Sequence, residues 1–355
     1  MAGELILILC DYFPRADAAA PESAQTRLPA LEMILARADH SLMPQGWRSN
    51  LGARFATPAL TALSPAATAA RAWLPAPPAP PPAPAAPAPQ HWLATPVHYF
   101  AGLDSVHLHP AGLLQLPGTE QSELVTDFRR VFGSSPWVLH ALDRRDLLLG
   151  GDPLGASADD PAQFLGRDPS EGLPRGEAAA TLRRLGVEIE MWLHEHPINL
   201  ARLRRGELPV TALWLWGASP GTQARADAGR RLWRAAHPDA PAGSSRLLGQ
   251  DLYAEALWRL QAARTESLPA DFESACHAGA GAGDVLVLYP TLGALGLGDA
   301  LQRLERNWVA PALAALRAGR LLGLELLAGS SAYRLRRRQL ARLWRAPAPW
   351  WERLV

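Results

Sequence analysis

Residues 186–221 constrain the possible fold more than any other part of the chain. Across the start of this stretch, from residue 182 to residue 193, apolar residues recur three or four positions apart, which places them on one face of an α-helix. These residues are Leu182, Leu185, Ile189, Trp192 and Leu193. The sequence therefore predicts an amphipathic helix with one buried face.

A break, a second short helix and a strand follow this helix. Pro197 lacks a backbone N–H and disfavours a helical conformation at the preceding residue, so the chain must turn there. We expect the side chain of Asn199 to cap the turn. Leu208 and Pro209 end the second helix, which is basic. Residues 210–216 are too apolar for an exposed edge and predict a central strand with both faces covered.

Strands and helices alternate along most of the remaining chain. Residues 4–10 form an apolar run that ends at Asp11, which is typical of a parallel strand with a polar residue at its carboxyl end. Two further buried strands are predicted at residues 284–289 and 321–327. Helices are predicted at residues 28–38, 222–236, 249–263 and 299–316. This alternation favours an α/β fold with a parallel sheet, in which ligands bind at the carboxyl ends of the strands.

A proline-rich segment, residues 75–90, separates the first part of the chain from a second group of elements. Its missing N–H groups favour an extended, polyproline-like tether. Residues 91–174 then predict two strands, a helix and two more strands, which form a small inserted α+β domain. The α/β core would comprise residues 1–74 and 175–355, and we expect residues 47–73 to be irregular.

The composition excludes several classes of function. The formal net charge is +1, from 35 basic and 34 acidic residues, so it gives no strong signal for nucleic-acid binding. Every basic residue is Arg, which excludes Schiff-base and P-loop lysine chemistry. The two cysteines, Cys10 and Cys276, provide neither a disulfide framework nor a zinc-binding spacing. The N-terminal apolar run is too short for a signal peptide or membrane span, so we expect a cytoplasmic protein.

The sequence HPINLARLRRGELPVTALWLWGASPG, which begins at His196, resembles a segment of archaeal-type cofactor-independent phosphoglycerate mutases. There, a His-Pro-Val/Ile-Asn motif precedes an Arg, a Gly, a Pro, an apolar strand and a Gly turn. The matching residues are His196, Pro197, Asn199, Arg202, Gly206, Pro209 and Gly217. A branch of proteobacterial phosphoglycerate mutase-like or RpfE-type regulatory proteins shares this segment, and the chain resembles that branch most.

This resemblance implies an alkaline phosphatase-like parallel-sheet core that holds two divalent metal ions, Mn or Zn, through Asp and His residues. Asp11 matches one of the ligand positions, although a Tyr follows it where the family has a Gly. The resembling enzymes carry a nucleophilic Ser in about the region of residues 49–64. The candidates there are Ser49, Thr57, Thr61 and Ser64.

The chain departs from these enzymes where most of their metal ligands lie. Residues 290–296 follow one core strand and residues 328–334 follow the next, and neither stretch contains a carboxylate or an imidazole. Two divalent ions beside a single carboxylate would remain uncompensated, so we expect no cofactor. The leading hypothesis is a divergent, degenerate mutase-like protein that binds a protein partner or an anionic small molecule. One form of this hypothesis gives the protein a regulatory role. The alternative is an active mutase that uses two metal ions to interconvert 3- and 2-phosphoglycerate.

A third hypothesis, an esterase, depends on residues 217–221, which match the G-x-S-x-G pattern of a nucleophile elbow with Ser219 as nucleophile. The residue after the nucleophile normally donates its N–H to the oxyanion, and Pro220 has none. Losing one such donor costs ~3 kcal/mol of transition-state stabilisation. A plain turn that caps the next helix is the other interpretation of the same residues.

Three further groups of residues have both a structural and a functional interpretation. Glu190 and His194 lie one helical turn apart, on a face that is either solvated or functional. Three histidines, at positions 98, 107 and 109, have a spacing that permits chelation but lack a nearby carboxylate. Residues 333–354 interleave Arg with Trp and Tyr, which suits phosphate contacts, a membrane surface, or packing of the aromatic residues on the core.

Overall fold

The computed structural model describes residues 3–10, 12, 27–43, 46–75, 89–102, 105–142, 146–175, 179–218, 245–277, 283–290 and 297–354. Asp11, Ser219 and the predicted helix at residues 222–236 lie outside these residues. The contacts of the chain define two compact units. The first unit comprises Met1–Thr57, Arg225–Gln250 and Gln261–Val355, and the second comprises Pro58–Ala224 and Asp251–Leu260.

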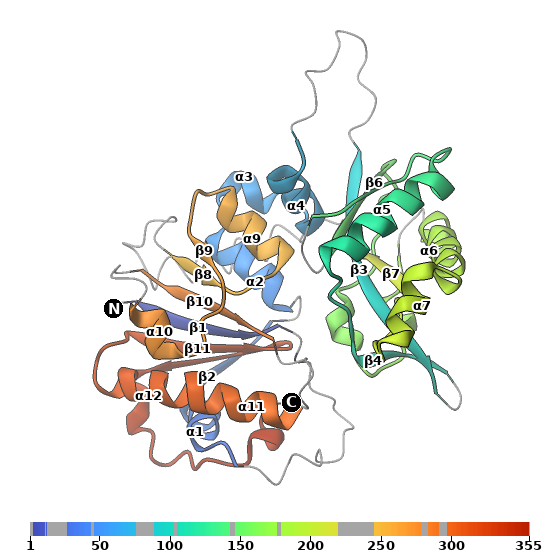
Figure 1. Ribbon diagram of the computed structural model, residues 1–355. Coiled ribbons are helices and arrows are strands. Elements are labelled where there is room, and N and C mark those ends of the chain that lie inside the picture. Colours follow the sequence, from blue (N-terminus) through green and yellow to red (C-terminus); the bar gives the residue numbers. More distant parts are fainter. Residues whose placement is uncertain are drawn as a thin grey trace. The chain divides into compact units, whose positions relative to one another are not determined.

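A seven-stranded sheet forms the centre of the first unit, in the order β2-β12-β11-β1-β10-β8-β9 (Figure 1). Its strands are β1 (Glu4–Leu9), β2 (Asp39–Leu42), β8 (Arg246–Leu248), β9 (Thr265–Glu266), β10 (Val285–Tyr289), β11 (Gly323–Ala328) and β12 (Ser331–Arg336). β1 pairs in parallel with β10 on one side and with β11 on the other. β8 and β9 continue the parallel part, whereas β12 and β2 are antiparallel. The prediction of an α/β fold with a parallel sheet is confirmed.

Helices cover both faces of this sheet. On one face, α1 (Pro29–Arg37), α11 (Leu297–Leu304), a π-helical turn η4 (Glu305–Val309) and α12 (Ala310–Arg317) pack on alternate residues of the strands (Figure 1). On the other face, Arg54 of α2 (Gly46–Phe55) forms a buried ion pair of 2.8 Å with Glu325 of β11. Since both faces are covered, the central strands are buried and, apart from Glu4 and Glu325, carry no charged side chains. Among its described residues, this unit also contains the helices α10 (Phe272–His277), η5 (Arg337–Ala341) and η6 (Trp350–Glu352).

An antiparallel five-stranded sheet forms the centre of the second unit. Its strands are β3 (Gln90–Ala101), β4 (Val106–Leu113), β5 (Val138–His140), β6 (Leu147–Gly151) and β7 (Ala212–Trp216). Three helices, α5 (Gly118–Phe132), α6 (Ala179–His194) and α7 (Pro197–Arg204), pack against one face of the sheet (Figure 1). The predicted order of strands and helix in residues 91–174 is confirmed. The short helices η2 (Pro161–Phe164) and η3 (Pro169–Gly172) complete the stretch.

The structure corrects the prediction for residues 210–216. β7 is fully buried, as predicted, but it pairs antiparallel with β3 and belongs to the second unit, not to the parallel core. Likewise, α6 and α7 pack in the core of the second unit, although we expected the α/β core to resume at residue 175. An apolar run indicates that a strand is buried, but it does not indicate which strand lies beside it.

Residues 47–73 are helical rather than irregular. α2 is followed by α3 (Pro58–Thr61) and α4 (Pro65–Trp73). Alanine has the highest helix propensity, and α4 begins with a capping Ser and a Pro in its first turn, so the local sequence favours helix. α4 packs beside α9 (Leu252–Arg259), where the guanidinium of Arg259 lies 4.6 Å from the ring centroid of Trp73.

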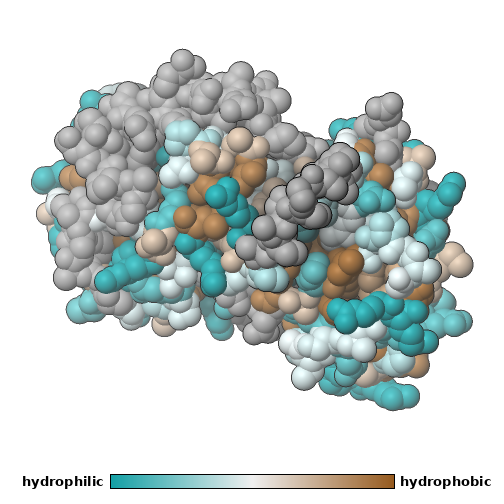
Figure 2. All heavy atoms as spheres, turned by 90° about the horizontal axis from the view of Figure 1, so that it is seen from above, coloured by the Kyte–Doolittle hydropathy of each residue, from teal (hydrophilic) through white to brown (hydrophobic). Residues whose placement is uncertain are grey.

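The surface mixes polar and apolar residues. On the face shown in Figure 2, hydrophobic residues form small groups between hydrophilic ones. In the part of the chain that the structure describes, no helix is long and apolar enough to cross a membrane.

Candidate functional site

The carboxyl ends of β1, β10 and β11 lie together at one edge of the seven-stranded sheet, where ligands bind in folds of this class. Two aromatic side chains, Trp47 of α2 and Tyr12, lie near the end of β1. Trp47 donates its indole N–H to the carbonyl of Cys10 over 3.3 Å, and the hydroxyl of Tyr12 donates to the carbonyl of Leu354 over 2.9 Å. Burial raises the pKa of Tyr12 well above its usual value. Asp11, the predicted metal ligand between these residues, lies outside the described part of the chain.

β11 ends in a tight turn. Ala328 of β11 pairs with Ser331 of β12, so that only Gly329 and Ser330 connect the two strands. Gly329 has a φ of +55°, which suits a glycine at such a turn. This connection occupies the position where the resemblance implies Asp and His ligands. The imidazole of His40 on β2 bonds to the Ser331 hydroxyl over 3.0 Å and stacks on Tyr333.

The described residues at this edge do not provide a two-metal site. Among the described residues, no three His, Cys, Asp or Glu side chains lie close enough to hold a metal ion. Residues 291–296, which follow β10, lie outside the described part, but they contain only Thr, Leu, Gly and Ala side chains. Directly after these three strands the sequence contains one carboxylate, that of Asp11, and a single carboxylate does not balance two divalent ions.

Ser64, the predicted catalytic candidate, has a structural role. Its hydroxyl oxygen accepts the N–H of Ala67 over 3.1 Å and caps α4, and its carbonyl accepts both the N–H and the hydroxyl of Thr68. Ser64 belongs to the second unit, whereas β1 and Asp11 belong to the first. Thr61 donates its hydroxyl to the carbonyl of Pro58, as is common in short helices. The second catalytic candidate, Ser219, lies outside the described residues.

Asn199 connects α6, α7 and the chain before β7. Its side-chain N–H groups donate to the carbonyls of Leu193 and Val210, each over 2.7 Å. Its side-chain oxygen accepts the N–H of Val210 over 2.7 Å. Asn199 is buried and does not cap the turn, which differs from our prediction. The cap is His196, whose Nδ1 accepts the N–H of Ile198 over 3.3 Å.

Arg202 fixes the same segment to α5. Its guanidinium is buried, donates to Glu120 over 2.7 Å and also donates to the carbonyl of Leu208 over 2.8 Å. Arg205 reaches the other oxygen of the Glu120 carboxylate over 2.5 Å. The Glu120 carboxylate thus joins two arginines of the α7 region to the first turn of α5.

The remaining motif residues shape the backbone around α7 and β7. Pro197 occupies the first turn of α7, and Pro209 accepts a hydrogen bond at its carbonyl from His98 Nδ1 over 2.9 Å. Gly206 and Gly217 both have a φ of +73°, which disfavours any other residue. At Gly217, an added Cβ would also lie 3.3 Å from a methyl carbon of Leu93. Each residue of the motif that carries the resemblance therefore has a structural role.

The other predicted groups are separate from this motif. Glu190 and His194 are both exposed on α6, which agrees with a solvated face. His107 bonds to the hydroxyl of Ser105 over 2.9 Å, and His109 Nδ1 accepts the N–H of Ala111 over 3.0 Å. Their bonds are thus made within the β3–β4 region.

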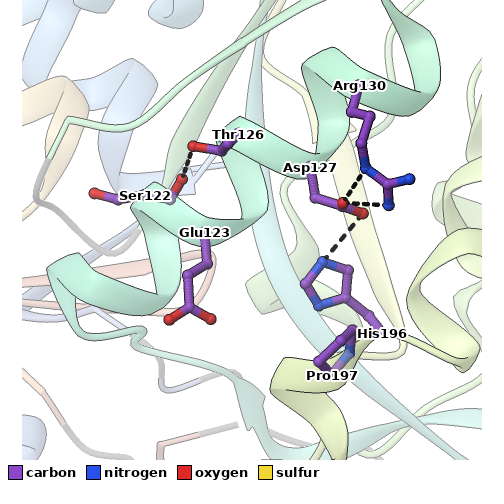
Figure 3. Close-up of a pocket in the computed structure, with 7 residues that line it drawn as sticks. All are labelled: Ser122, Glu123, Thr126, Asp127, Arg130, His196 and Pro197. Carbon is purple, nitrogen blue, oxygen red and sulfur yellow. Dashed lines mark hydrogen bonds and ion pairs between the residues drawn. The ribbon is translucent and has the colours of Figure 1, made fainter.

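A pocket of about 480 Å³ lies between α5 and the start of α7. It is lined by Ser122, Glu123, Thr126, Asp127, Arg130, His196 and Pro197 (Figure 3). Asp127 accepts hydrogen bonds from the indole of Trp192 over 2.8 Å and from Nε of Arg130 over 2.9 Å. These bonds, led by that of Trp192, lower the pKa of Asp127 below its usual value.

His196 is 5% exposed, and its Nε2 lies 3.5 Å from Oδ2 of Asp127, which is too long for a good hydrogen bond (Figure 3). Burial lowers the pKa of His196, so the imidazole is neutral at pH 7. Because Nδ1 accepts the hydrogen bond from the N–H of Ile198 that caps α7, the ring proton must lie on Nε2. The imidazole therefore has no free lone pair, and it can act neither as a general base nor as a metal ligand while α7 stays capped.

Charge limits what this pocket can bind. Its lining contributes two carboxylates, Glu123 and Asp127, against one guanidinium, that of Arg130. Its net charge is thus negative and does not suit an anionic small molecule. Sequence reasoning missed Asp127 because the residue lies on α5, far from His196 along the chain, and nothing in the local pattern joins the two.

Comparisons with known proteins give short matches to one kind of enzyme. No family model matches the chain. A 2,3-bisphosphoglycerate-independent phosphoglycerate mutase of Methanothrix thermoacetophila is 37% identical over 60 residues, which is 17% of this chain and 15% of the relative. The corresponding mutase of Methanosarcina acetivorans is 32% identical over 75 residues, 21% of this chain and 19% of the relative. A probable mutase of Geobacter sulfurreducens is 29% identical over 100 residues, 28% of this chain and 25% of the relative.

Solved structures match over most of the chain but at low scores. A cofactor-independent phosphoglycerate mutase from Thermoplasma acidophilum covers 94% of this chain and 89% of its own, with 12% identity and a TM-score of 0.35. A Pyrococcus horikoshii protein covers 94% of this chain and 86% of its own, with 10% identity and a TM-score of 0.43. Because these scores are low, the α/β fold is assigned from the strand order and register of this chain and not from these matches. The sequence matches point to phosphoglycerate mutase-like proteins and span a fifth or less of the first relatives.

Proposed function

We propose that this chain is a divergent phosphoglycerate mutase-like protein that has lost metal-dependent phosphoryl transfer and acts by binding a protein partner or an anionic small molecule. The observation that supports this most directly is the two-residue connection between β11 and β12. It replaces a ligand-bearing loop with Gly329 and Ser330, and the side chains after β10 add no ligand. The parallel sheet remains, while its carboxyl edge lacks the donors that two cations require.

The pocket between α5 and α7 does not suit an anionic ligand, because the side chains that line it carry a net negative charge. The carboxyl edge of the seven-stranded sheet fits better. There the aromatic residues Trp47 and Tyr12 contact the end of β1, and neither contributes a negative charge at neutral pH. Tyr12 remains protonated because burial raises its pKa.

Metal content tests the proposal directly. The full chain, purified without chelator or nickel affinity resin, is analysed by plasma mass spectrometry alongside the Asp11→Asn variant. We expect no stoichiometric Mn or Zn in either protein, and no interconversion of 3- and 2-phosphoglycerate with any divalent metal added. Two ions per chain that Asp11→Asn removes, together with turnover, would establish the alternative of an active mutase.

The active-mutase alternative is supported by the names of the relatives in the sequence comparison, all of which are mutases or probable mutases. The esterase hypothesis has its own measurement. A fluorophosphonate probe labels an activated serine. We expect no labelling of Ser219, so the parent chain and the Ser219→Ala variant should give the same result. If the probe labels the parent chain but not the Ser219→Ala variant, the esterase hypothesis is supported and the active site lies at residues 217–221.

A further inference from the structure

The C-terminal segment exposes two large apolar residues side by side. Arg345 donates its N–H to the carbonyl of Arg342 over 3.1 Å and closes a turn with Leu343 and Trp344 at its tip. Leu343 is 73% exposed and Trp344 is 78% exposed. By contrast, Trp350, a few residues later, is 2% exposed and packs in the core of the first unit. The tail is thus attached to the core, and its turn projects from it.

Contacts of the flanking arginines hold this turn in place. Arg342 donates to Oδ1 of Asp39 over 2.6 Å and to the carbonyl of Arg37 over 3.1 Å. Arg345 donates to the carbonyl of Ala38 over 3.1 Å. All three partners lie where α1 ends and β2 begins. Because both sides of the turn are fixed to the folded core, Leu343 and Trp344 project from a well-defined position.

The turn lies toward the amino-terminal edge of the parallel sheet, away from the candidate ligand edge. Arg336, which precedes η5, pairs with Gly323 at the first residue of β11. Leu322, just before β11, is also exposed, at 61%. An added Cβ at Gly319 would lie 3.3 Å from the guanidinium of Arg337, which places η5 beside the loop that enters β11. This edge is therefore physically separate from the ends of β1, β10 and β11.

The same edge is strongly basic. Residues 337–345, RRQLARLWR, contain four arginines and no acidic residue. Arg337 and Arg338 are exposed, as are Arg317 and Arg320 at the end of α12 and in the loop that follows it. Among the described residues, Asp39 accepts from Arg342, and Glu273 lies 3.4 Å from Arg320. Glu4, at the start of β1, is buried and pairs with Arg334 over 2.7 Å and with Arg336 over 3.8 Å, so it does not offset the arginines of residues 337–345. The surface thus combines an exposed Leu–Trp pair with a surplus of arginine.

We propose that this surface, formed by residues 337–345 and by Arg317, Arg320 and Leu322, docks the first unit on an anionic lipid bilayer. Tryptophan favours the membrane–water interface and leucine favours the acyl region, while arginines near the surface attract anionic headgroups. The convex turn would place its apolar tip in the bilayer and keep the surrounding guanidinium groups at headgroup level.

Two other classes of partner fit less well. Single-stranded nucleic acid would use Trp344 for stacking and the arginines for phosphates, but it leaves an exposed Leu343 without a role. An acidic protein would need a matching apolar hollow for the turn. The bilayer uses the apolar pair and the spread of arginines together, and it requires no preformed cavity.

The test is co-sedimentation of the full chain with phosphatidylcholine vesicles, with and without phosphatidylserine, at low and high salt. We expect binding only when phosphatidylserine is present, with a loss at high salt. An Arg337→Gln/Arg338→Gln variant should bind about 30-fold more weakly, since each arginine near an anionic surface contributes about fivefold in affinity. A Leu343→Ser/Trp344→Ser variant should lose binding by at least about tenfold.

Met191→Ser is the matched control, because Met191 is 71% exposed on α6 of the second unit and lies outside the proposed surface. It should bind as the parent does, and the thermal unfolding of all variants should coincide because each replaced side chain is exposed. Failure of the parent to bind anionic vesicles, equal binding to pure phosphatidylcholine, or full binding by the Leu343→Ser/Trp344→Ser variant would each overturn the proposal. Preference for single-stranded RNA or for a polyglutamate chain over vesicles would also overturn it and assign the surface to that class.

Discussion

Replacement of Asn199 by Ala separates a structural from a functional role for the motif that carries the resemblance. The Asn199 side chain makes three hydrogen bonds, all to the backbone, and is buried. Asn199→Ala removes these bonds and opens no route for water to replace them. If the motif is structural, the variant should lose stability; if it serves a ligand, stability should change little.

The structure sets the size of the effect. The N–H and C=O of Val210 would both lose a buried partner, whereas the carbonyl of Leu193 would still accept the N–H of His196 over 3.1 Å. A buried polar group left unpaired costs about 1–3 kcal/mol, and a satisfied bond that is lost costs about 1 kcal/mol. We therefore expect a loss of about 3–7 kcal/mol, which is a large part of the stability of a typical domain.

Urea unfolding, followed by circular dichroism, measures the total loss, and hydrogen exchange of a peptide that spans residues 205–216 measures it locally. Asn307→Ala is the control, since Asn307 makes one exposed bond of 3.3 Å to the carbonyl of Ala270. That change should cost less than about 0.5 kcal/mol. If Asn199→Ala costs no more than the control, or if exchange at Val210 is unchanged, the structural account of the motif is wrong.

Three further predictions concern other contacts. The pKa of His196 is lowered in the folded state, so below about pH 6.5 the unfolded chain takes up a proton that the folded chain does not. Stability should therefore be intact above about pH 6.5 and fall below it, and His196→Asn should flatten this part of a pH–stability profile. Arg54→Met leaves Glu325 charged and buried and should cost about 3–5 kcal/mol in urea unfolding, whereas replacing both residues by Met should restore most of the loss. Gly217→Ala should reduce the melting temperature more than Gly155→Ala, because both glycines have positive φ but an added Cβ at Gly155 meets open space; equal effects would contradict this.

The parts of the fold that were predicted from sequence are those in which one short stretch contains the whole signal. The apolar run at residues 4–10 and the face formed by residues 182–193 correspond to β1 and α6. Strand pairing is different in kind. β7 joins β3, which lies more than a hundred residues earlier, through backbone hydrogen bonds that any sequence can make. Nothing in residues 210–216 distinguishes a strand of the antiparallel sheet from one of the parallel sheet.

The candidate site shows the same limit. A turn after the first helix was predicted from Pro197, but the capping residue was assigned to Asn199 and is in fact His196. Both residues have cap-competent side chains in the right place. The difference comes from the carbonyl and N–H of Val210, eleven residues on, which engage Asn199 and leave the cap to His196. Such long-range competition for a side chain is invisible in a local pattern.

Under the proposed function, the chain has lost metal-ligand residues and kept its fold, and these two changes are physically separable. The first unit is held together mainly by apolar burial between β1, β10, β11 and the helices that cover them, and each buried methylene group contributes about 0.8 kcal/mol. A metal-binding loop at the end of a strand contributes little to that total, because its side chains bind the ion and not the core. On this proposal, a short connection after β11, made of Gly329 and Ser330, carries no metal ligand and still leaves the core intact. We therefore expect the protein to be stable without metal, and added Mn or Zn should leave its melting temperature unchanged.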